Sequence, residues 1–298
     1  MESTAELRHQ GQAPPSGREA PEPAEPPVTV IEARPGWRFI DLGELWRYRE
    51  LLFFLTWRDV KVRYKQTVLG AAWAILQPLA TMVVFSLFFG RVASGAAADV
   101  PYPLFVLAGL VPWMFFAHAI SSAAQSIIGD QNLVTKVYFP RLIIPMGAVG
   151  SGLVDLAISF SLLVVLTLGF GVRPNWGIVL VPLLALGLVV AALGVGTLLA
   201  ALTVAYRDFR YVVPFMIQLW MFATPGIYLQ ADAGLSPRWQ ALLPLNPAQG
   251  LIVNFRAAAL GGTLDPYALA LSVLVGLALL LVGGFYFRKV ERSFADII

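Results

Sequence analysis

Long apolar runs separated by short polar segments dominate the pattern of this chain. Six runs stand out, at 68–90, 104–128, 142–170, 178–205, 211–229 and 267–287. Each approaches or exceeds the ~20 helical residues that cross ~30 Å of hydrocarbon. The pattern therefore predicts an all-α integral membrane protein with six transmembrane helices.

A more polar segment with a helical period precedes the first apolar run. Its aromatic positions recur at helical spacing on one face, and its basic residues project to the side of that face. A large aromatic face beside a basic face is typical of a helix that lies in the membrane interface. We therefore expect an amphipathic cytoplasmic interface helix over 41–67, and the alternative is a helix that only anchors the chain. The aromatic face comprises Trp46, Phe53, Trp57, Val60 and Tyr64.

The connection between the fifth and sixth runs is too apolar for an ordinary loop. Pro225, Pro237, Pro244 and Pro247 cut it into pieces that are too short to cross a bilayer individually. Non-helical backbone enters a membrane only where protein or a water-filled cavity satisfies its polar groups. The prediction is a re-entrant helical pair, near 237–243 and 248–260, at the non-cytoplasmic mouth. A surface-lying amphipathic loop is the alternative.

Composition supports a membrane protein with a polar tail. Hydrophobic residues make up 58% of the chain and charged residues 13%, and the mean hydropathy is +0.72. Residues 1–40 are rich in Pro and Glu, and such a segment buries too little apolar surface to order itself. The expected organisation is a disordered tail (1–40), the interface helix (41–67) and a six-span domain (68–292).

Basic residues at the ends of the apolar runs predict the orientation. The richer set flanks the first run and recurs at Lys136, Arg141, Arg207, Arg210 and Arg288, whereas the opposite ends carry fewer. Positive charge marks cytoplasmic segments, so both termini are expected in the cytoplasm. This placement beside apolar runs also fits membrane topology better than nucleic-acid binding, and no nucleic-acid partner is expected.

Several enzymatic chemistries lack their residues in this sequence. There is no cysteine, and the two histidines are His9 and His118, so a Cys-based or two-histidine metal motif is missing. No Gly-Lys pair occurs, so the chain has no phosphate-cradling P-loop. We expect no catalytic residues, no bound metal and no cofactor.

Among the polar residues inside the predicted spans, the candidates for a functional role are His118, Gln125 and Asp155. Intramembrane ionisable groups are costly and face protein or a water-filled path. Asp155 could line a pathway or pair with a basic residue such as Arg141. It could equally hydrogen-bond across a close helix contact at Gly150 and Gly152. His118 and Gln125 lie seven residues apart and are expected on one helix face.

Four ordered strings resemble one family. They are WRDVKVRYKQTVLGAAWAILQPL (57–79), FPRLIIP (139–145), AYRDFRYVVPF (205–215) and NPAQGLIVNFR (246–256). The first looks like the signature of ABC-2-type permeases that export polysaccharides, such as O-antigen, capsule and teichoic acid, across the bacterial inner membrane. The others occur where that family would place them, and together they cover the chain from about 41 to 292.

The resemblance implies a half-transporter. A second copy of the chain would complete the pathway, and two ATP-binding cassette subunits would carry ATP and Mg²⁺ and dock on the cytoplasmic face. The interface helix and the connection at 131–141 would be the surfaces to which the ATP-binding subunits transmit their movement. The family's periplasmic gate helices would map onto 237–260, with Trp239, Asn246 and Arg256 as candidate gate residues. The cargo would be a glycan on a polyprenyl-pyrophosphate lipid.

Two further sets of residues follow as candidates. A lipid pyrophosphate needs a positive field at the cytoplasmic leaflet, which basic residues can provide. Attraction of the same basic residues to anionic membrane lipids is the alternative explanation. A sliding sugar chain suits aromatic faces, although these residues could equally face lipid or sit in an interfacial belt. The head-group or ATPase-coupling set is Arg58, Asp59, Lys61, Arg63, Lys65, Lys136 and Arg141. The channel-lining set is Phe85, Phe88, Phe89, Trp113, Phe115, Phe116, Trp220, Phe222 and Tyr228.

Other functions remain open at this point. A permease of the same superfamily that exports a drug or a lipid would share the topology without a polymer-sized pore. A membrane-embedded enzyme that modifies a glycolipid would turn over without an ATPase. A purely structural anchor would need neither the re-entrant segment nor polar groups inside the membrane.

Overall fold

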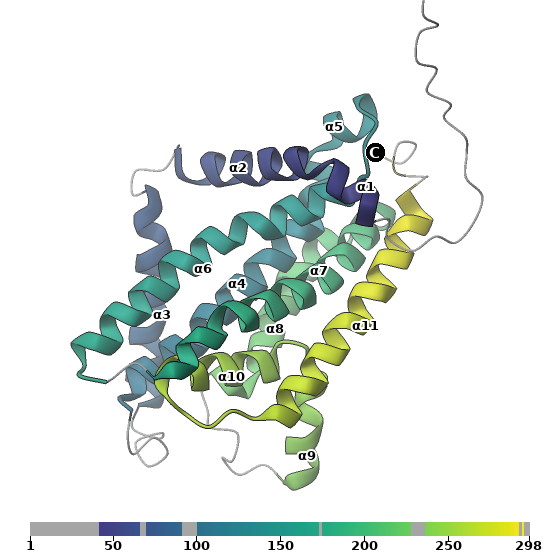
Figure 1. Cartoon of the computed structure of the whole chain (residues 1–298). Helices are drawn as coiled ribbons and strands as arrows, with labels where there is room; N and C mark the ends of the chain where they lie inside the picture. The colour runs from purple at the N-terminus through teal and green to yellow at the C-terminus, as the bar shows by residue number, and fades with distance from the viewer. Residues whose placement is uncertain are drawn as a thin grey trace, which may run out of the picture. The chain divides into compact units, whose positions relative to one another are not determined.

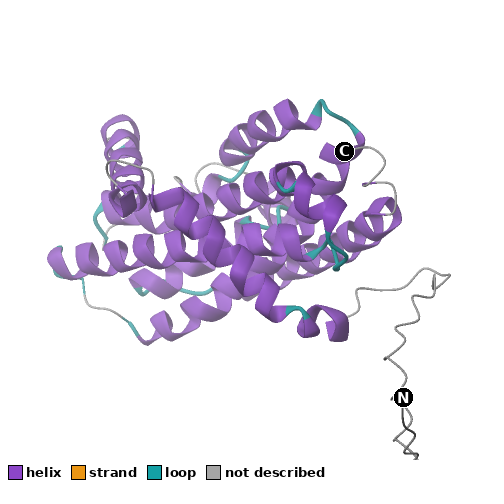
Figure 2. Cartoon of the chain, turned by 90° about the horizontal axis from the view of Figure 1, so that it is seen from above, coloured by secondary structure: helices purple, strands orange, loops and turns teal. Residues whose placement is uncertain are grey.

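The computed structural model describes residues 42–65, 70–90, 100–172, 175–227, 236–291 and 294. All regular structure in these ranges is helical (Figures 1 and 2). The tail predicted for 1–40 lies outside the described residues, as do Val68, Leu69 and Tyr228. The helices are α1 (Leu42–Arg47), α2 (Arg49–Lys65), α3 (Trp73–Phe89), α4 (Tyr102–Gly129), α5 (Gln131–Lys136), α6 (Ile143–Gly169), α7 (Val181–Ala205), α8 (Phe209–Phe222), α9 (Pro237–Leu242), α10 (Gln249–Leu260) and α11 (Pro266–Glu291), with 3-10 turns η1 (Gly70–Ala72), η2 (Trp176–Leu180), η3 (Pro225–Ile227) and η4 (Leu243–Leu245).

Four described helices are long and apolar enough to cross a membrane: Tyr102–Gly129, Ile143–Gly169, Trp176–Ala205 and Pro266–Glu291. They correspond to four of the six predicted spans, so an all-helical protein with several candidate spans is confirmed. The other two predicted spans form shorter apolar helices. At 1.5 Å per residue, the 17 residues of α3 extend about 25 Å and the 14 residues of α8 about 21 Å. Pro225 begins a separate 3-10 turn after α8, which is why that helix is shorter than its apolar run.

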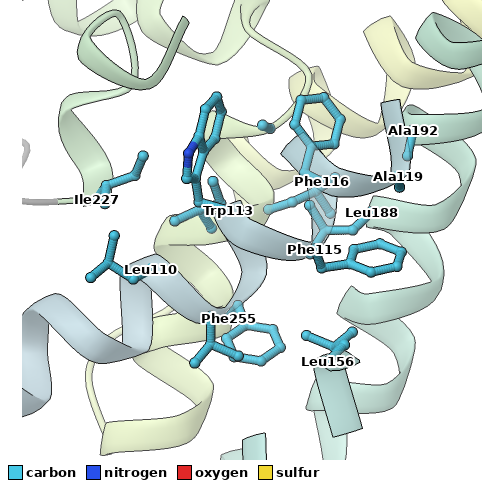
Figure 3. Packing of buried hydrophobic residues seen from close by; sticks show 14 of the residues in the cluster. Leu110, Trp113, Phe115, Phe116, Ala119, Leu156, Leu188, Ala192, Ile227 and Phe255 are labelled. Carbon is cyan, nitrogen blue, oxygen red and sulfur yellow. The ribbon is translucent and has the colours of Figure 1, made fainter. Parts of the chain in front are cut away.

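Helix α4 is the centre of the described bundle. Of its most apolar window, 78% is buried by protein, compared with 28% for α11. Phe116 and Leu107 of α4 are fully buried, and Leu188 of α7 and Phe255 of α10 complete the same core (Figure 3). An apolar sequence alone cannot distinguish a lipid-facing helix from a central one, because both read as continuous hydrophobic runs.

A second apolar cluster seats α2 on the bundle. Leu55 of α2 is buried there with Ile127 of α4, Ile143 of α6 and Phe287 of α11. Helix α2 therefore lies across the end of the bundle where α4 ends and α6 begins, whereas α9 and α10 lie at the opposite end (Figure 1). The amphipathic helix predicted for 41–67 is interrupted at Tyr48 and ends at Lys65 in the described residues.

Helix α10 is packed into the protein rather than spread over its surface. Ten of its twelve residues are buried, and it contacts α4, α7 and α11. Ser272 of α11 explains the close approach, because its hydroxyl accepts a hydrogen bond from the Gly250 amide at 2.9 Å. A Cβ atom at Gly250 would collide with the Ala268 carbonyl of α11. Glycine at this position therefore sets the distance between α10 and α11.

Gly250→Ala is expected to destabilise the protein by about 1–3 kcal/mol, because the new methyl group overpacks a backbone contact. Thermal unfolding of the purified protein in detergent measures the effect. Gly169→Ala is the matched control, since nothing lies within 4 Å of a Cβ at that helix end. Equal melting temperatures for the two variants would contradict the close contact between α10 and α11.

Candidate functional site

Helix α2 lies against α6 because α6 presents small residues along one face. A Cβ atom at Gly147 would lie 3.2 Å from Leu55 Cβ, and one at Gly150 would lie 3.1 Å from Thr56 Oγ1. Positions 147, 150, 151 and 155 follow the i, i+3, i+4, i+8 pattern of a single helix face. We call this contact the α2 seam: Leu55, Thr56, Arg63 and Tyr64 of α2 against Gly147, Gly150, Ser151 and Asp155 of α6.

Arg63 and Asp155 form the centre of a polar cluster at one end of the α2 seam. Arg63 Nη1 donates to Asp155 Oδ2, and Nη2 donates to Ser151 Oγ at 3.2 Å and contacts His118 Nε2 of α4. The Tyr64 hydroxyl donates to the other carboxylate oxygen of Asp155. Arg63, Tyr64, His118, Ser151 and Asp155 are the polar cluster below. It joins α2, α4 and α6 and satisfies both oxygens of Asp155.

The donors and acceptors of the polar cluster define its protonation state. A guanidinium group can only donate, so His118 Nε2 accepts and the imidazole proton is on Nδ1. The Ser122 hydroxyl lies 3.0 Å from the same nitrogen. Burial, followed by the hydrogen bond to Asp155, raises the pKa of Tyr64 to about 12, so the phenol remains protonated. The cluster is therefore one compensated ion pair with neutral groups around it.

Asp155 pairs with a basic residue, which was one of the predicted alternatives, but that residue is Arg63 and not Arg141. The Arg141 amide donates to Glu291 Oε1 at 3.0 Å, and the Arg141 guanidinium donates to the Glu291 carbonyl oxygen. Asp155 lies 14 residues beyond Arg141, which is about 21 Å along a helix. Gln125, expected to share a face with His118, is exposed and hydrogen-bonds to Ser121 of its own helix at 3.4 Å. His118 therefore joins the polar cluster and Gln125 does not.

Arg58 makes a second polar contact between α2 and the bundle. Its guanidinium donates to Asp130 at 2.8 and 2.7 Å and to Asp59 at 3.0 and 2.8 Å. The hydrogen bond to Asp130 is the largest cause that raises the pKa of Arg58. Asp130 follows α4 and immediately precedes α5, so this Arg58–Asp130 clamp joins α2 to the α4–α5 connection.

The predicted head-group or coupling residues thus divide into two groups. Arg58, Arg63 and Arg141 contact other parts of the chain, and Asp59 accepts hydrogen bonds from the neighbouring Arg58. Lys61, Lys65 and Lys136 are exposed, and the Lys61 ammonium lies 5.5 Å from the centre of the Trp57 ring. Within this set, the three lysines present their charges outward in the structure.

The predicted channel aromatics occupy different environments. Trp113, Phe115 and Phe116 are buried in the α4 core (Figure 3), so in this conformation they offer no surface to a passing polymer. Phe88 of α3 is 75% exposed and Phe222 of α8 is 56% exposed. The remaining described members, Phe85, Phe89 and Trp220, make ring contacts: Phe85 with Phe89 at 5.7 Å and Trp220 with Phe116 at 5.3 Å between ring centres.

The three predicted gate residues differ in how firmly they are held. Asn246 accepts from Trp220 Nε1 at 3.0 Å and donates to Thr224 Oγ1 at 2.8 Å, which ties the start of α10 to α8. Arg256 is 9% exposed, and its guanidinium lies 3.9 Å from the centre of the Phe105 ring of α4. Trp239 on α9 is exposed. Asn246 and Arg256 therefore fix the position of α10.

The sequence pattern predicts no role for Asp130, Ser151 or Ser272, and for Tyr64 only a place on the aromatic face of the interface helix. A signal existed for Asp130, which is the only acidic residue between positions 100 and 154. Serine and tyrosine are ordinary residues of apolar helices and interfaces, and nothing in the pattern separates these members from the rest. Among the described residues, no three His, Cys, Asp or Glu side chains gather in a way that could hold a metal ion.

The Arg58–Asp130 clamp can be measured with a double-mutant cycle. The coupling energy between Arg58→Ala and Asp130→Ala is expected to be about 0.5–1 kcal/mol, because both side chains are partly exposed. Unfolding in detergent provides the four stabilities. Lys61→Ala combined with Asp130→Ala is the control and should be additive. A coupling energy of zero for the Arg58 cycle would refute the clamp.

Comparison with known proteins agrees with the helical pattern and the four ordered strings. Residues 50–260 match the family model described as ABC-2 type transporter. The O-antigen export system permease protein RfbA of Myxococcus xanthus is 32% identical over 86% of this chain and 98% of its own length. A Klebsiella pneumoniae protein of the same name is 29% identical over 84% of this chain and 95% of its own length.

A shorter match is to the polysialic acid transport protein KpsM of Escherichia coli, which is 30% identical over 76 residues, or 26% of this chain and 30% of that protein. The family model covers well over half of the chain, and the Myxococcus xanthus relative aligns over nearly its whole length. The resemblance inferred from the motifs is confirmed: the chain belongs to the ABC-2 type transporter family.

Proposed function

We propose that this chain is the transmembrane subunit of an ATP-driven exporter that moves a lipid-linked polysaccharide across the bacterial cytoplasmic membrane. The observation that carries the proposal is the similarity to an O-antigen export system permease over 86% of the chain. The partial similarity to a polysialic acid transport protein supports the same substrate class. The cargo is an O-antigen, capsule or teichoic-acid type of glycan on a polyprenyl-pyrophosphate carrier.

Energy reaches this subunit from separate chains in the proposed mechanism. The sequence has no Gly-Lys pair and so no P-loop, and two ATP-binding cassette subunits supply ATP hydrolysis. They dock on α2 and α5, and the Arg58–Asp130 clamp makes those two helices respond together. Lys136 and Tyr138, both exposed beside α5, provide contact surface for the ATPase. Both termini are cytoplasmic in this arrangement.

The proposed membrane domain has six spans and works as a pair of identical subunits. Helices α3 and α8 are the remaining two of the six proposed spans. Both carry large exposed apolar side chains, including Leu87 and Phe88 of α3 and Phe215 and Leu219 of α8. Such faces are stable against lipid or against a second copy of the chain. The cargo passes between the two copies, and the α9–α10 pair closes the non-cytoplasmic mouth as a re-entrant element.

The relatives decide between this proposal and its rivals. An exporter of drugs or lipids would share the family, but the relatives described above are named for the export or transport of O-antigen and polysialic acid. A glycolipid-modifying enzyme would act without ATP. A passive anchor would not require polar groups that join α2, α4 and α6. Export of a lipid-linked glycan accounts for all of these observations.

Reconstitution tests the proposal directly. Proteoliposomes that contain this chain, its ATP-binding subunit and a polyprenyl-pyrophosphate-linked glycan are expected to move the glycan across the bilayer when ATP is added. An ATPase subunit whose P-loop lysine is replaced is the control and should abolish movement. Modification of the glycan without the ATPase, or ATP-driven movement of a simple lipid but not of the glycan, would refute the assignment.

Charge reversal separates two roles of the basic residues on α2. Lys61→Glu and Lys65→Glu are expected to reduce export about five-fold or more at low salt, since each basic residue near an anionic head group contributes about 1 kcal/mol. High salt should shrink these defects because it screens exposed charges. Arg58→Glu should reduce export at any salt concentration because it breaks the Arg58–Asp130 clamp.

All three variants should remain inserted in the membrane, which fluorescence-detected size-exclusion chromatography verifies. Wild-type export by Lys61→Glu and Lys65→Glu together would remove head-group attraction from the role of α2.

A further inference from the structure

Arg63 is held by groups from two other helices. Its guanidinium contacts Asp155 and Ser151 of α6 and His118 of α4. The adjacent Tyr64 directs its hydroxyl to the same carboxylate. Donors on two consecutive residues of α2 therefore converge on the single carboxylate of Asp155. This geometry binds one helix to another through a single carboxylate, whose two oxygens accept from two different residues of α2.

The packing beside this polar cluster restricts how α2 can move. Leu55 and Thr56 fit over Gly147 and Gly150, at distances that any added Cβ would make tight. Sliding α2 along α6 would press these side chains against bulkier residues of the same face, such as Ile143 and Ile144, which are buried in the cluster that contains Leu55. The seam has one register, because interlocked side chains do not deform continuously.

Two polar contacts hold α2 against rotation about its own axis. Arg58 contacts Asp130 at the end of α4, and Arg63 contacts His118 within α4 and Asp155 within α6. The two arginines lie five residues apart, or about 7.5 Å along the helix. Because α2 is held at two separated points and is also packed on glycines, a force applied to α2 moves α4 and α6 with it.

We propose that Asp155 is a positioning residue that acts through Arg63 and Tyr64 to hold α2, α4 and α6 together, so that the α2 seam stays closed throughout the export cycle. This inference rests on the proposed function, because its consequence is the efficiency of export per ATP. The Asp155 carboxylate fixes the position of α2 relative to α6 while the ATPase subunit moves α2.

A disulfide across the seam tests whether it stays closed. The chain contains no cysteine, so an introduced pair is the only one that this subunit can form. A Cβ at position 150 would lie 3.8 Å from Thr56 Cβ, close to the mean Cβ separation of about 3.8 Å in disulfides. In the double variant Thr56→Cys with Gly150→Cys, the first substitution also removes the methyl group that would crowd position 150.

The oxidised double variant is expected to export glycan at the rate of its reduced form. Loss of export on oxidation, with recovery after a reductant, would show that the seam must open and would overturn the proposal. The single variant Thr56→Cys and the cysteine-free chain, both treated with the same oxidant, are the controls. The ATP-binding subunit must be cysteine-free in all of these assays.

Asp155→Asn tests the positioning role, because asparagine keeps the size of the side chain and removes its charge. The glycan moved per ATP hydrolysed is expected to fall about five-fold or more. Oxidising the same engineered disulfide between positions 56 and 150 in the Asp155→Asn background should restore that ratio, since the disulfide then holds the seam in place of the ion pair. A merely local loss of stability would lower protein yield and melting temperature without changing this ratio.

Two results would overturn the proposal: an unchanged ratio in Asp155→Asn, or a defect that the disulfide does not repair. If Asp155→Asn does not assemble with the ATPase subunit, Arg63→Lys replaces it, because a single ammonium group cannot reach both Asp155 and His118. The same defect and the same repair are expected. Absence of export by the wild-type chain would instead refute the proposed function, so the two failures are distinguishable.

Discussion

The ion pair between Arg63 and Asp155 is the constraint on which the end of the bundle that carries α2 depends. An aspartate inside an apolar helix is expensive unless a cation and hydrogen-bond donors compensate its charge. The chain supplies these from α2, where Arg63 and Tyr64 together reach both carboxylate oxygens. The requirement is reciprocal: Asp155 is tolerated in α6 because α2 lies beside it, and α2 is held there because Asp155 attracts it.

The glycines of α6 make this pairing possible. Gly147 and Gly150 allow α2 to approach closely enough for Arg63 to reach Asp155. The Arg58–Asp130 clamp holds α2 at a second point, at the end of α4. A similar arrangement occurs at the opposite end of the described bundle. There, Gly250 allows α10 to approach α11, while Asn246 and Arg256 bind the segment to α8 and α4. In both places a small residue permits the contact and a polar side chain specifies its register.

Part of the candidate site could be predicted from the sequence and part could not. The sequence pattern indicates His118 and Asp155 as polar residues inside apolar runs, and both lie in helices long and apolar enough to cross a membrane. The partner of Asp155 could not be predicted in this way, because Arg63 lies 92 positions away and only packing brings the two together. For the same reason Arg58 and Arg63 read as outward-facing charges, although both contact the chain itself. Helix rotation, which hydropathy does not report, decided that Trp113, Phe115 and Phe116 are buried.

The sequence by itself determined that the chain is helical, rich in candidate spans and a member of its family, since apolar length and ordered motifs are local properties. It also located the basic helix before the first span and the broken connection before the last. Only the tertiary structure decided that α4 is the central helix, that α10 is buried, and which charges pair. These features depend on contacts between residues far apart in the chain, and side-chain geometry at close approach rather than local pattern selects such contacts.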